Sequence, residues 1–455
     1  MKIIAEWTST WVLCATTVLV LSASAPSRAQ TLTTLVSFDG SNGRSPHGRL
    51  VQGSDGNFYG TAASNEANGL GSVFKITPSG TLTRLVSFDW NSGWRPEAGL
   101  VQGSDGHFYG TTVWGGASDD GTVFKVTPSG TLTTLVSFNG SNGSEPRACL
   151  VQGSDGDFFG TTCIGGSGIS GYGTVFKVTP SGALTTLVLF DWNNGAYPYA
   201  GLVQGNDDHF YGTTSEGGSN RHGTVFKVTP SGALITLVSF DGSNGANPYA
   251  GLVLGSDGDF YGTTAGGGTS GYGTVFKMTS SGALTSLVSF NGSNGRWPAA
   301  GLVQGTDGNL YGTTYSGGTN DDGTVFKMTP SGALTTLISF DGANGSIPYA
   351  GLVQASDGQF YGTTSRGGNS DNGTVFRLTL PPPLRVSAFA ISGGNADLTW
   401  NTISGKTYQV QYKASQYDAA RTNLGSPIAA TGDSISISDP VAQNTQRFYR
   451  IVQVD

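Results

Sequence analysis

The sequence predicts an all-β protein, a seven-bladed β-propeller closed by its N-terminal strand and followed by a small β-sandwich. Three observations support this prediction. Variants of one ten-residue segment occur seven times. The first is GSDGNFYGTA, which begins at Gly53. The units that contain them repeat every 50 residues, with one step of 52, and periods near this length are typical of propellers and solenoids. Each unit contains four strand-like runs, and none of them has a helical period.

The repeat is marked by a phenylalanine followed by Asp or Asn. These markers are Phe38, Phe88, Phe138, Phe190, Phe240, Phe290 and Phe340. The four runs of a unit are of the types GLVQ, NFYGTT, GTVFKVT and LTTLVSF, and SDG and PSG turns separate them. β-Branched and aromatic residues favour strands, and Gly, Pro, Asp and Ser favour turns. Because four antiparallel strands form one propeller blade, seven units predict seven blades.

The two ends of the repeat region are complementary. Residues 31–38 match the fourth run of a unit, and the last unit ends at 373–380 without its fourth run. Together these fragments make one blade, and a ring closed in this way leaves no open sheet edge. The alternative is a linear β-solenoid, which predicts capping units at both ends.

The chain is expected to contain a signal peptide before the repeats. Lys2 precedes a short apolar run, Trp11–Leu21, and small residues place the cleavage site after Ala29. The alternative is a membrane anchor, but this run is shorter than the ~20 apolar residues that cross a bilayer. The expected parts are 1–29 as signal peptide, 30–380 as propeller, 381–383 as a proline linker and 384–455 as β-sandwich.

Composition narrows the classes of partner. Charged residues make up 12% of the chain and the net charge is −7. A nucleic acid or an anionic membrane would require a basic face, so neither is expected as a partner. No segment after the first thirty residues is apolar enough to span a membrane. We expect an exported monomer, extracellular or at the cell surface.

The repeat resembles a named family. The core YGTT…GTVFK, over about residues 31–380, is similar to the GloVer tandem repeat. This resemblance implies an exported bacterial array of β-repeats with a variable C-terminal module and no assigned activity, so it supplies no catalytic residues. A more distant likeness is to kelch propellers, whose later Trp is absent here. The tail pattern LTW…YQVQY…FYRIV resembles a fibronectin-like β-sandwich.

Strand order assigns the loops of the predicted propeller to two faces. The short SDG and PSG turns share one face, and the long, varied loops share the other, where binding residues are usually concentrated. Flat aromatic rings beside polar groups suit sugar rings. The candidate ligand-binding residues on this face are Trp90, Trp94, Trp114, Trp192, Trp297 and Tyr315. Tyr199, Tyr249 and Tyr349 recur at one repeat position, which favours packing between blades.

These features predict a binding or surface-display module, with a polysaccharide or a surface protein as partner and without catalysis or a cofactor. No two histidines have the spacing of metal ligands. A calcium site needs about six to eight oxygen ligands, and one Asp in the turn of each unit cannot supply them. No G-x-S-x-G motif is present. A glycoside-cleaving enzyme is one alternative, because its pair of carboxyl groups could come from the loop aspartates and the long-loop residues Glu97, Glu145 and Glu216. A purely structural envelope repeat is the other.

Cys149 and Cys163 flank a single SDG turn, on the first two strands of one unit. We expect a disulfide between them, because adjacent strands bring an even pair of cysteines together after export. The alternative is two buried free thiols that act as small apolar residues.

Overall fold

The computed structural model describes residues 30–64, 69–166, 171–381, 384–403, 405–415, 417–441 and 447–454, together with the backbone of β1 (Ala5–Glu6), β2 (Ser9–Cys14) and β3 (Thr17–Leu21). The chain divides into two compact units, one formed by Thr31–Thr379 and the other by Met1–Gln30 with Leu380–Asp455. The predicted cleavage site after Ala29 and Pro382 and Pro383 of the predicted linker lie outside the described residues. Across the described parts, no helix is long and apolar enough to cross a membrane.

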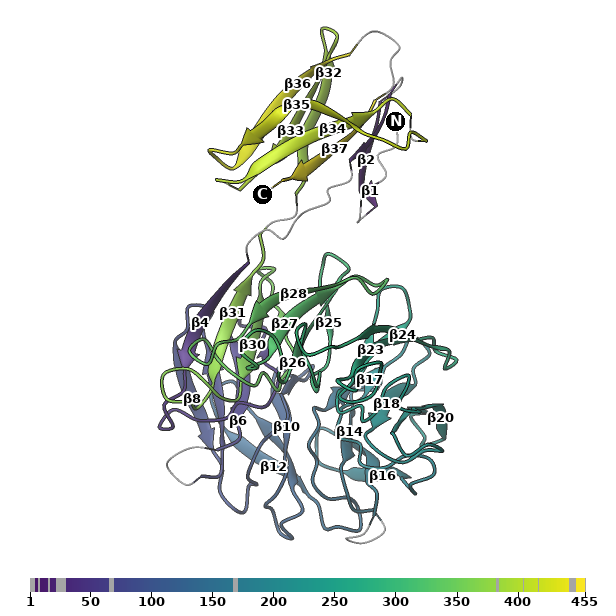
Figure 1. Ribbon diagram of the computed structural model, residues 1–455. Helices are drawn as coiled ribbons and strands as arrows, with labels where there is room; N and C mark the ends of the chain where they lie inside the picture. Colours follow the sequence, from purple (N-terminus) through teal and green to yellow (C-terminus); the bar gives the residue numbers. More distant parts are fainter. Residues whose placement is uncertain are drawn as a thin grey trace. The chain divides into compact units, whose positions relative to one another are not determined.

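The unit Thr31–Thr379 is a ring of seven four-stranded antiparallel sheets (Figure 1). Six sheets use four consecutive strands each. They are β5 (Val51–Gln52), β6 (Phe58–Ala62), β7 (Ser72–Ile76), β8 (Leu82–Ser87); β9 (Val101–Gln102), β10 (Phe108–Thr112), β11 (Thr122–Val126), β12 (Leu132–Ser137); β13 (Val151–Gln152), β14 (Phe158–Thr162), β15 (Thr174–Val178), β16 (Leu184–Leu189); β17 (Val203–Gln204), β18 (Phe210–Thr214), β19 (Thr224–Val228), β20 (Leu234–Ser239); β21 (Val253–Leu254), β22 (Phe260–Thr264), β23 (Thr274–Met278), β24 (Leu284–Ser289); and β25 (Val303–Gln304), β26 (Leu310–Thr314), β27 (Thr324–Met328), β28 (Leu334–Ser339).

The seventh sheet takes its strands from both ends of the repeat region. Its order is β29 (Val353–Gln354), β30 (Phe360–Thr364), β31 (Thr374–Thr379) and β4 (Thr31–Ser37). The antiparallel register pairs Thr379 with Thr31 and Thr374 with Ser37. Seven four-stranded antiparallel sheets confirm the predicted seven-bladed propeller. We number the blades 1 to 7 from the sheet β5–β8 to the sheet β29–β30–β31–β4.

The repeated SDG segment forms the turn between the first two strands of each blade. In blade 1, Gly53 N donates to Asn57 O at 2.8 Å, Gly56 has a φ of 79°, and Asn57 N donates to Asp55 Oδ1 at 3.1 Å. The second carboxylate oxygen of Asp55 accepts from Tyr59 Oη at 2.9 Å and from Lys75 Nζ at 2.8 Å. The repeated Asp therefore fixes the turn and ties it to the second and third strands.

One blade departs from the turn sequence, because Asp208 stands where the other turns have glycine. Its φ is 58°, a left-handed conformation that Asp tolerates better than most residues. The predicted GLVQ run also differs, since only its last two residues form the innermost strand. A Cβ on Gly99 would lie 2.4 Å from Arg49 O of the preceding blade, so the chain leaves the sheet where neighbouring backbones meet.

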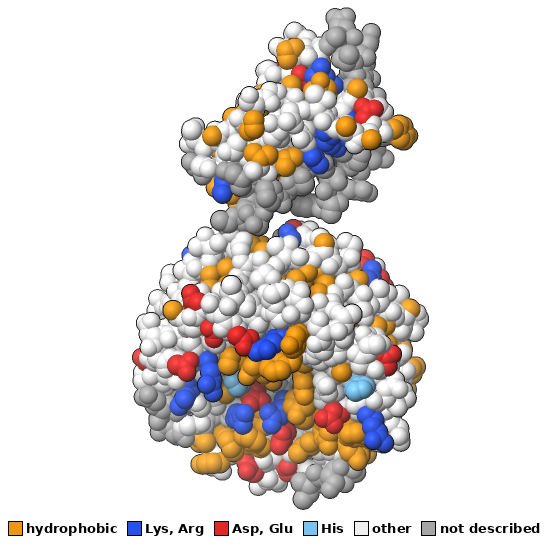
Figure 2. Space-filling model, viewed as in Figure 1, with side chains coloured by type: hydrophobic (Ala, Val, Ile, Leu, Met, Phe, Trp, Pro, Cys, Tyr) orange, Lys and Arg blue, Asp and Glu red, His pale blue; other side chains and the backbone are white. Residues whose placement is uncertain are grey.

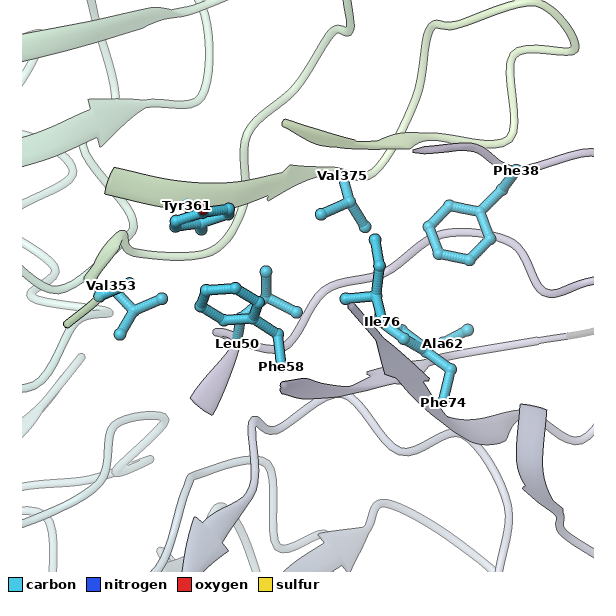
Figure 3. Packing of buried hydrophobic residues seen from close by; sticks show 10 residues of the cluster. Phe38, Leu50, Phe58, Ala62, Phe74, Ile76, Val353, Tyr361 and Val375 are labelled. Atoms are coloured by element: carbon cyan, nitrogen blue, oxygen red, sulfur yellow. The ribbon is translucent and has the colours of Figure 1, made fainter. Parts of the chain in front are cut away.

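Hydrophobic cores fill the spaces between neighbouring blades. Figure 3 shows Tyr361 and Val375 of blade 7 facing Phe58 and Ile76 of blade 1. The rings of Phe58 and Tyr361 lie 4.1 Å apart. Equivalent ring pairs join five of the other blade contacts, among them Tyr59–Phe108 at 3.9 Å. Stacked pairs of this kind bury large apolar surfaces, so the contacts between blades carry much of the stability of the ring.

The second unit is also built of strands. It contains the sheet β1–β2–β3 and two further three-stranded antiparallel sheets. These are β32 (Val386–Ser392), β33 (Asn395–Asn401), β36 (Ser434–Pro440), and β35 (Thr422–Ala429), β34 (Thr407–Lys413), β37 (Phe448–Gln453). Leu398, Trp400, Tyr408 and Tyr449 form a shared core with almost no exposure. The likeness to a fibronectin-like module stays a prediction.

Candidate functional site

The long loops are tied to each other within every blade. The loop that enters a blade pairs through an antiparallel bridge with the loop between its second and third strands. In blade 2, Trp94 N donates to Trp114 O at 2.8 Å and Trp114 N donates to Trp94 O at 3.2 Å. The seven bridges are Arg44–Ser64, Trp94–Trp114, Ser144–Ile164, Ala196–Glu216, Ala246–Gly266, Arg296–Ser316 and Ser346–Arg366. Side chains on this face therefore project from a fixed backbone.

The residue after each bridge has an unusual backbone conformation. In all seven blades it is a non-glycine residue with φ between 52° and 56°. These residues are Ser45, Arg95, Glu145, Tyr197, Asn247, Trp297 and Ile347. For Trp297, the N–H donates to Tyr272 O of the preceding blade at 2.9 Å, and its carbonyl accepts from Tyr315 N at 3.1 Å. Such strain persists only where surrounding bonds hold it, and it often occurs at binding sites.

Two residues further along, each blade contributes a side chain to a ring, which we call the inner ring. Its members are His47, Glu97, Arg147, Tyr199, Tyr249, Ala299 and Tyr349. Several neighbours in this ring are in contact. The His47 and Tyr349 rings lie 5.2 Å apart, the Tyr199 and Tyr249 rings also 5.2 Å, and Arg147 Nη1 lies 2.6 Å from Glu97 Oε2. Figure 2 shows hydrophobic side chains gathered on one face of the propeller, with acidic and basic side chains beside them.

A cavity of about 380 Å³ opens where the inner ring has its smallest member, Ala299. Its walls are the rings of Tyr249, Trp297, Tyr315 and Tyr349. The remaining lining residues are Asn247, Ala265, Gly266 and Ala299. The cavity therefore lies where blade 6 has a small side chain and three other blades have tyrosine. We call it the aromatic cavity.

The aromatic cavity combines exposed ring faces with neutral polar groups. Trp297 is 45% exposed and Tyr349 is 38% exposed. Burial raises the pKa of Tyr249 and of Tyr349, so both hydroxyls stay protonated and act as hydrogen-bond donors and acceptors. Asn247 Nδ2 donates to Ser215 O at 3.0 Å, which orients its amide. Apolar walls with a few fixed polar groups are the usual composition of a small-ligand site.

The opposite half of the inner ring is charged. Glu97 Oε1 lies 2.6 Å from Arg95 Nε and 3.8 Å from His47 Nδ1, and its Oε2 lies 2.6 Å from Arg147 Nη1. Arg147 Nη2 also lies 2.8 Å from Glu145 Oε2. Burial alone would raise the pKa of Glu97, but its contact with His47 and the charges of Arg147 and Arg95 lower it to about 2. Glu97 is therefore ionised at neutral pH.

The structure places the six predicted ligand-binding residues in three groups. Trp297 and Tyr315 lie in the aromatic cavity, with ring centroids 6.2 Å apart. The second group, in blade 2, is Trp90, Trp94 and Trp114, with successive ring separations of 5.2 Å and 4.4 Å. Arg95 covers Trp114 at 4.8 Å from the ring centroid, while Trp90 is 60% exposed.

The third group contains Trp192, whose ring contacts Tyr172 at 5.4 Å and Tyr197 at 6.2 Å. The sequence did not identify Asn247, Tyr249 and Tyr349 as cavity residues. Their recurrence at one repeat position favours packing for Tyr249 and Tyr349, and Tyr249 does contact Tyr199, yet both also line the aromatic cavity. The available signal was Ala299, the small residue in an otherwise large-residue series.

The predicted disulfide is not formed, because Cys149 and Cys163 are both free. The register pairs Val151 with Phe159, and its continuation places Cys149 opposite Thr161. Cys149 Sγ accepts from Gly99 N of the preceding blade at 3.1 Å. Cys163 lies beside Tyr199 of the following blade instead, and burial raises its thiol pKa to about 12. The two thiols therefore point to different neighbouring blades.

The fold and its repeats define the class of this protein, a tandem-repeat β-propeller. The chain matches the Gloeobacter/Verrucomicrobia repeat at residues 53–255 and 203–406. It therefore belongs to this repeat family, which confirms the resemblance found in the sequence. No curated protein matches the chain. In the described residues, no group of three or more His, Cys, Asp or Glu side chains is placed to hold a metal ion.

The chain also matches solved structures of proteins with different activities. Puromycin hydrolase is 14% identical, with 80% of this chain and 60% of that chain covered and a TM-score of 0.50. A gluconolactonase from Xanthomonas campestris is 13% identical, with 77% and 90% covered and a TM-score of 0.42. A β-xylosidase/α-arabinofuranosidase from a compost metagenome is 12% identical, with 62% and 97% covered and a TM-score of 0.30. At 14% identity, the likeness to puromycin hydrolase concerns the fold alone.

Proposed function

We propose that the protein binds a polysaccharide without cleaving it, and that the aromatic cavity holds one sugar ring. The observation that carries this proposal is the combination of four aromatic walls with the gap at Ala299. The apolar C–H face of a sugar ring packs against an aromatic face, and its hydroxyls need donors and acceptors at the edge. Trp297 supplies the exposed ring face, and the protonated tyrosine hydroxyls and the Asn247 amide supply the polar edge.

Two observations support binding rather than hydrolysis. Glycoside cleavage uses two carboxyl groups, about 5 to 10 Å apart, on either side of the scissile bond. The residues that line the aromatic cavity include no Asp or Glu. On the opposite half of the inner ring, Glu97 and Glu145 are both held by Arg147, and the low pKa of Glu97 makes it a poor proton donor at neutral pH.

The proposal includes an extracellular or cell-surface location. The expected signal peptide at 1–29 and the likeness of the tail to modules of exported proteins support it. The low content of charged side chains and the many tight turns of the propeller suit a rigid, exposed scaffold. In this interpretation the propeller presents its long-loop face to glycan, and the C-terminal unit serves for display.

The test measures binding of the chain from Gln30 onward to each member of a broad panel of polysaccharides. Ala299→Tyr fills the cavity with the side chain that three other blades carry at this position, so the fold should tolerate it. We expect this variant to lose binding, and the matched variant Ala299→Ser to keep it. Failure of the wild-type chain to bind any glycan on the panel would overturn the proposal. Release of reducing ends from a bound glycan would overturn the non-catalytic part.

A further inference from the structure

A second hollow lies beside the aromatic cavity, in the loops of blade 6. Its volume is about 400 Å³, and its lining includes Arg296, Gly317, Thr319, Asn320 and Asp321. We call it the polar hollow. It is built from the loop that enters blade 6 and the loop between β26 and β27 of that blade. The same two loops supply Trp297, Ala299 and Tyr315 to the aromatic cavity, whose other lining residues come from blades 5 and 7.

The two hollows share a wall. Arg296 of the polar hollow and Trp297 of the aromatic cavity are consecutive residues, and the Arg296 guanidinium lies 5.1 Å from the centroid of the Trp297 ring. On the other loop, Tyr315 of the aromatic cavity is two residues before Gly317 of the polar hollow. The bridge Arg296–Ser316 joins the two loops at this wall. A ligand longer than one ring can therefore cross from one hollow to the other over the exposed edge of Trp297.

Hydrogen bonds hold the polar groups of the polar hollow in place, and its one positive and one negative side chain cancel in charge. Arg296 forms an ion pair with Asp321 through Nη2, and its Nε donates to Ser316 Oγ at 2.9 Å. Asp321 Oδ1 accepts from Gly317 N at 2.8 Å, and Asn320 Nδ2 donates to Phe340 O at 2.9 Å. The carboxylate of Asp321 is still 58% exposed. The hollow thus presents fixed donors and acceptors with no net charge, which suits hydroxyl groups better than an ion.

Neighbouring blades lack this arrangement. At the position of Arg296, blade 5 has Ala246 and blade 7 has Ser346. At the position of Ala299, they have Tyr249 and Tyr349, which close the inner ring on either side. Blade 6 therefore differs from its neighbours at both hollows.

We propose that the two hollows are successive subsites for one neutral polysaccharide, with one sugar ring in the aromatic cavity and a later ring of the same chain in the polar hollow. The inference rests on the proposed function and adds the ligand class and the path of the chain. The aromatic cavity lies at the inner ring and the polar hollow further from it, so the glycan runs outward along blade 6. Uncharged, hydroxyl-rich sugars match the balanced Arg296–Asp321 pair and the net charge of −7.

The experiment compares chain lengths of a neutral glycan that the panel identifies. Calorimetry on the chain from Gln30 onward measures Kd for the monosaccharide and for its linear oligomers up to the tetramer. We expect the wild-type Kd to fall at least tenfold from the monosaccharide to the longer oligomers. Equal affinity for all lengths would overturn the inference while leaving the proposed function intact, whereas binding of no length would overturn both.

Two matched variants locate the second subsite. Thr319→Trp fills the polar hollow from an exposed position. The control, Thr269→Trp, makes the same change at the equivalent position of blade 5. Thr269 N donates to Ser289 Oγ, as Thr319 N donates to Ser339 Oγ. Thr319→Trp should remove the gain in affinity with length and leave monosaccharide binding unchanged. Thr269→Trp should change neither. Retention of the full length dependence in Thr319→Trp would overturn the inference.

Discussion

Replacement of Trp297 by alanine tests the aromatic cavity most directly. Trp297 is 45% exposed, and a Trp side chain offers up to about 250 Å² for burial, so about 110 Å² is open to a ligand. At about 25 cal/mol per Å², covering half to all of this area contributes about 1.4 to 2.8 kcal/mol. Trp297→Ala should therefore weaken binding by about 10- to 100-fold.

The assay is calorimetric titration of the wild-type chain and two variants with the same glycan. The control is Trp90→Ala, which removes a tryptophan that is 60% exposed on the same propeller but outside the aromatic cavity. We expect Trp90→Ala to bind as the wild type does, and circular dichroism should show that both variants are folded. The reasoning would be refuted by an unchanged affinity in Trp297→Ala, or by an equal loss in Trp90→Ala.

Three further predictions concern stability and thiol chemistry. Glu97 has a folded pKa of about 2 against an ordinary 4.5, so its ionised form stabilises the fold above pH 4.5, and this contribution of up to about 3 kcal/mol is lost as pH falls toward 2. Urea titrations should show a steeper loss of unfolding free energy between pH 5 and 2 in the wild type than in Glu97→Gln; parallel curves would contradict this. Ile347 is β-branched and has a φ of 55°, so Ile347→Asn, which copies blade 5, should raise stability by about 1 kcal/mol, and a lower melting temperature would count against the strain. The chain from Gln30 onward should show two reactive thiols in denaturant without reductant, because Cys149 and Cys163 are free; a count of zero would indicate a disulfide.

The blade architecture could be predicted because each unit repeats the same local instructions. Asp55 and Gly56 specify a turn, and the aromatic and β-branched residues from Phe58 onward specify a strand, which the structure buries on both faces. What the repeats could not specify was the length of the innermost strand. That strand ends where glycines such as Gly99 meet the backbone of the preceding blade, a contact between units.

The candidate site was only partly predictable for a related reason. Trp297 and Tyr315 were found because a single sequence reveals large aromatic residues on long loops. The aromatic cavity itself depends on Ala299, where the informative feature is a missing side chain. The charged partners His47, Glu97 and Arg147 also occupy equivalent positions in successive blades, but their contacts depend on how closely the blades approach at the inner ring.

The pairing of β4 with β31 has a consequence for the evolution of the chain. The repeat region does not begin and end at blade boundaries. The seventh blade takes one strand from the N-terminal end of the repeats and three from the C-terminal end. A recombination event that inserts or removes one whole unit, at any phase, leaves these complementary ends unchanged. The joint between the two ends is therefore independent of the number of units between them.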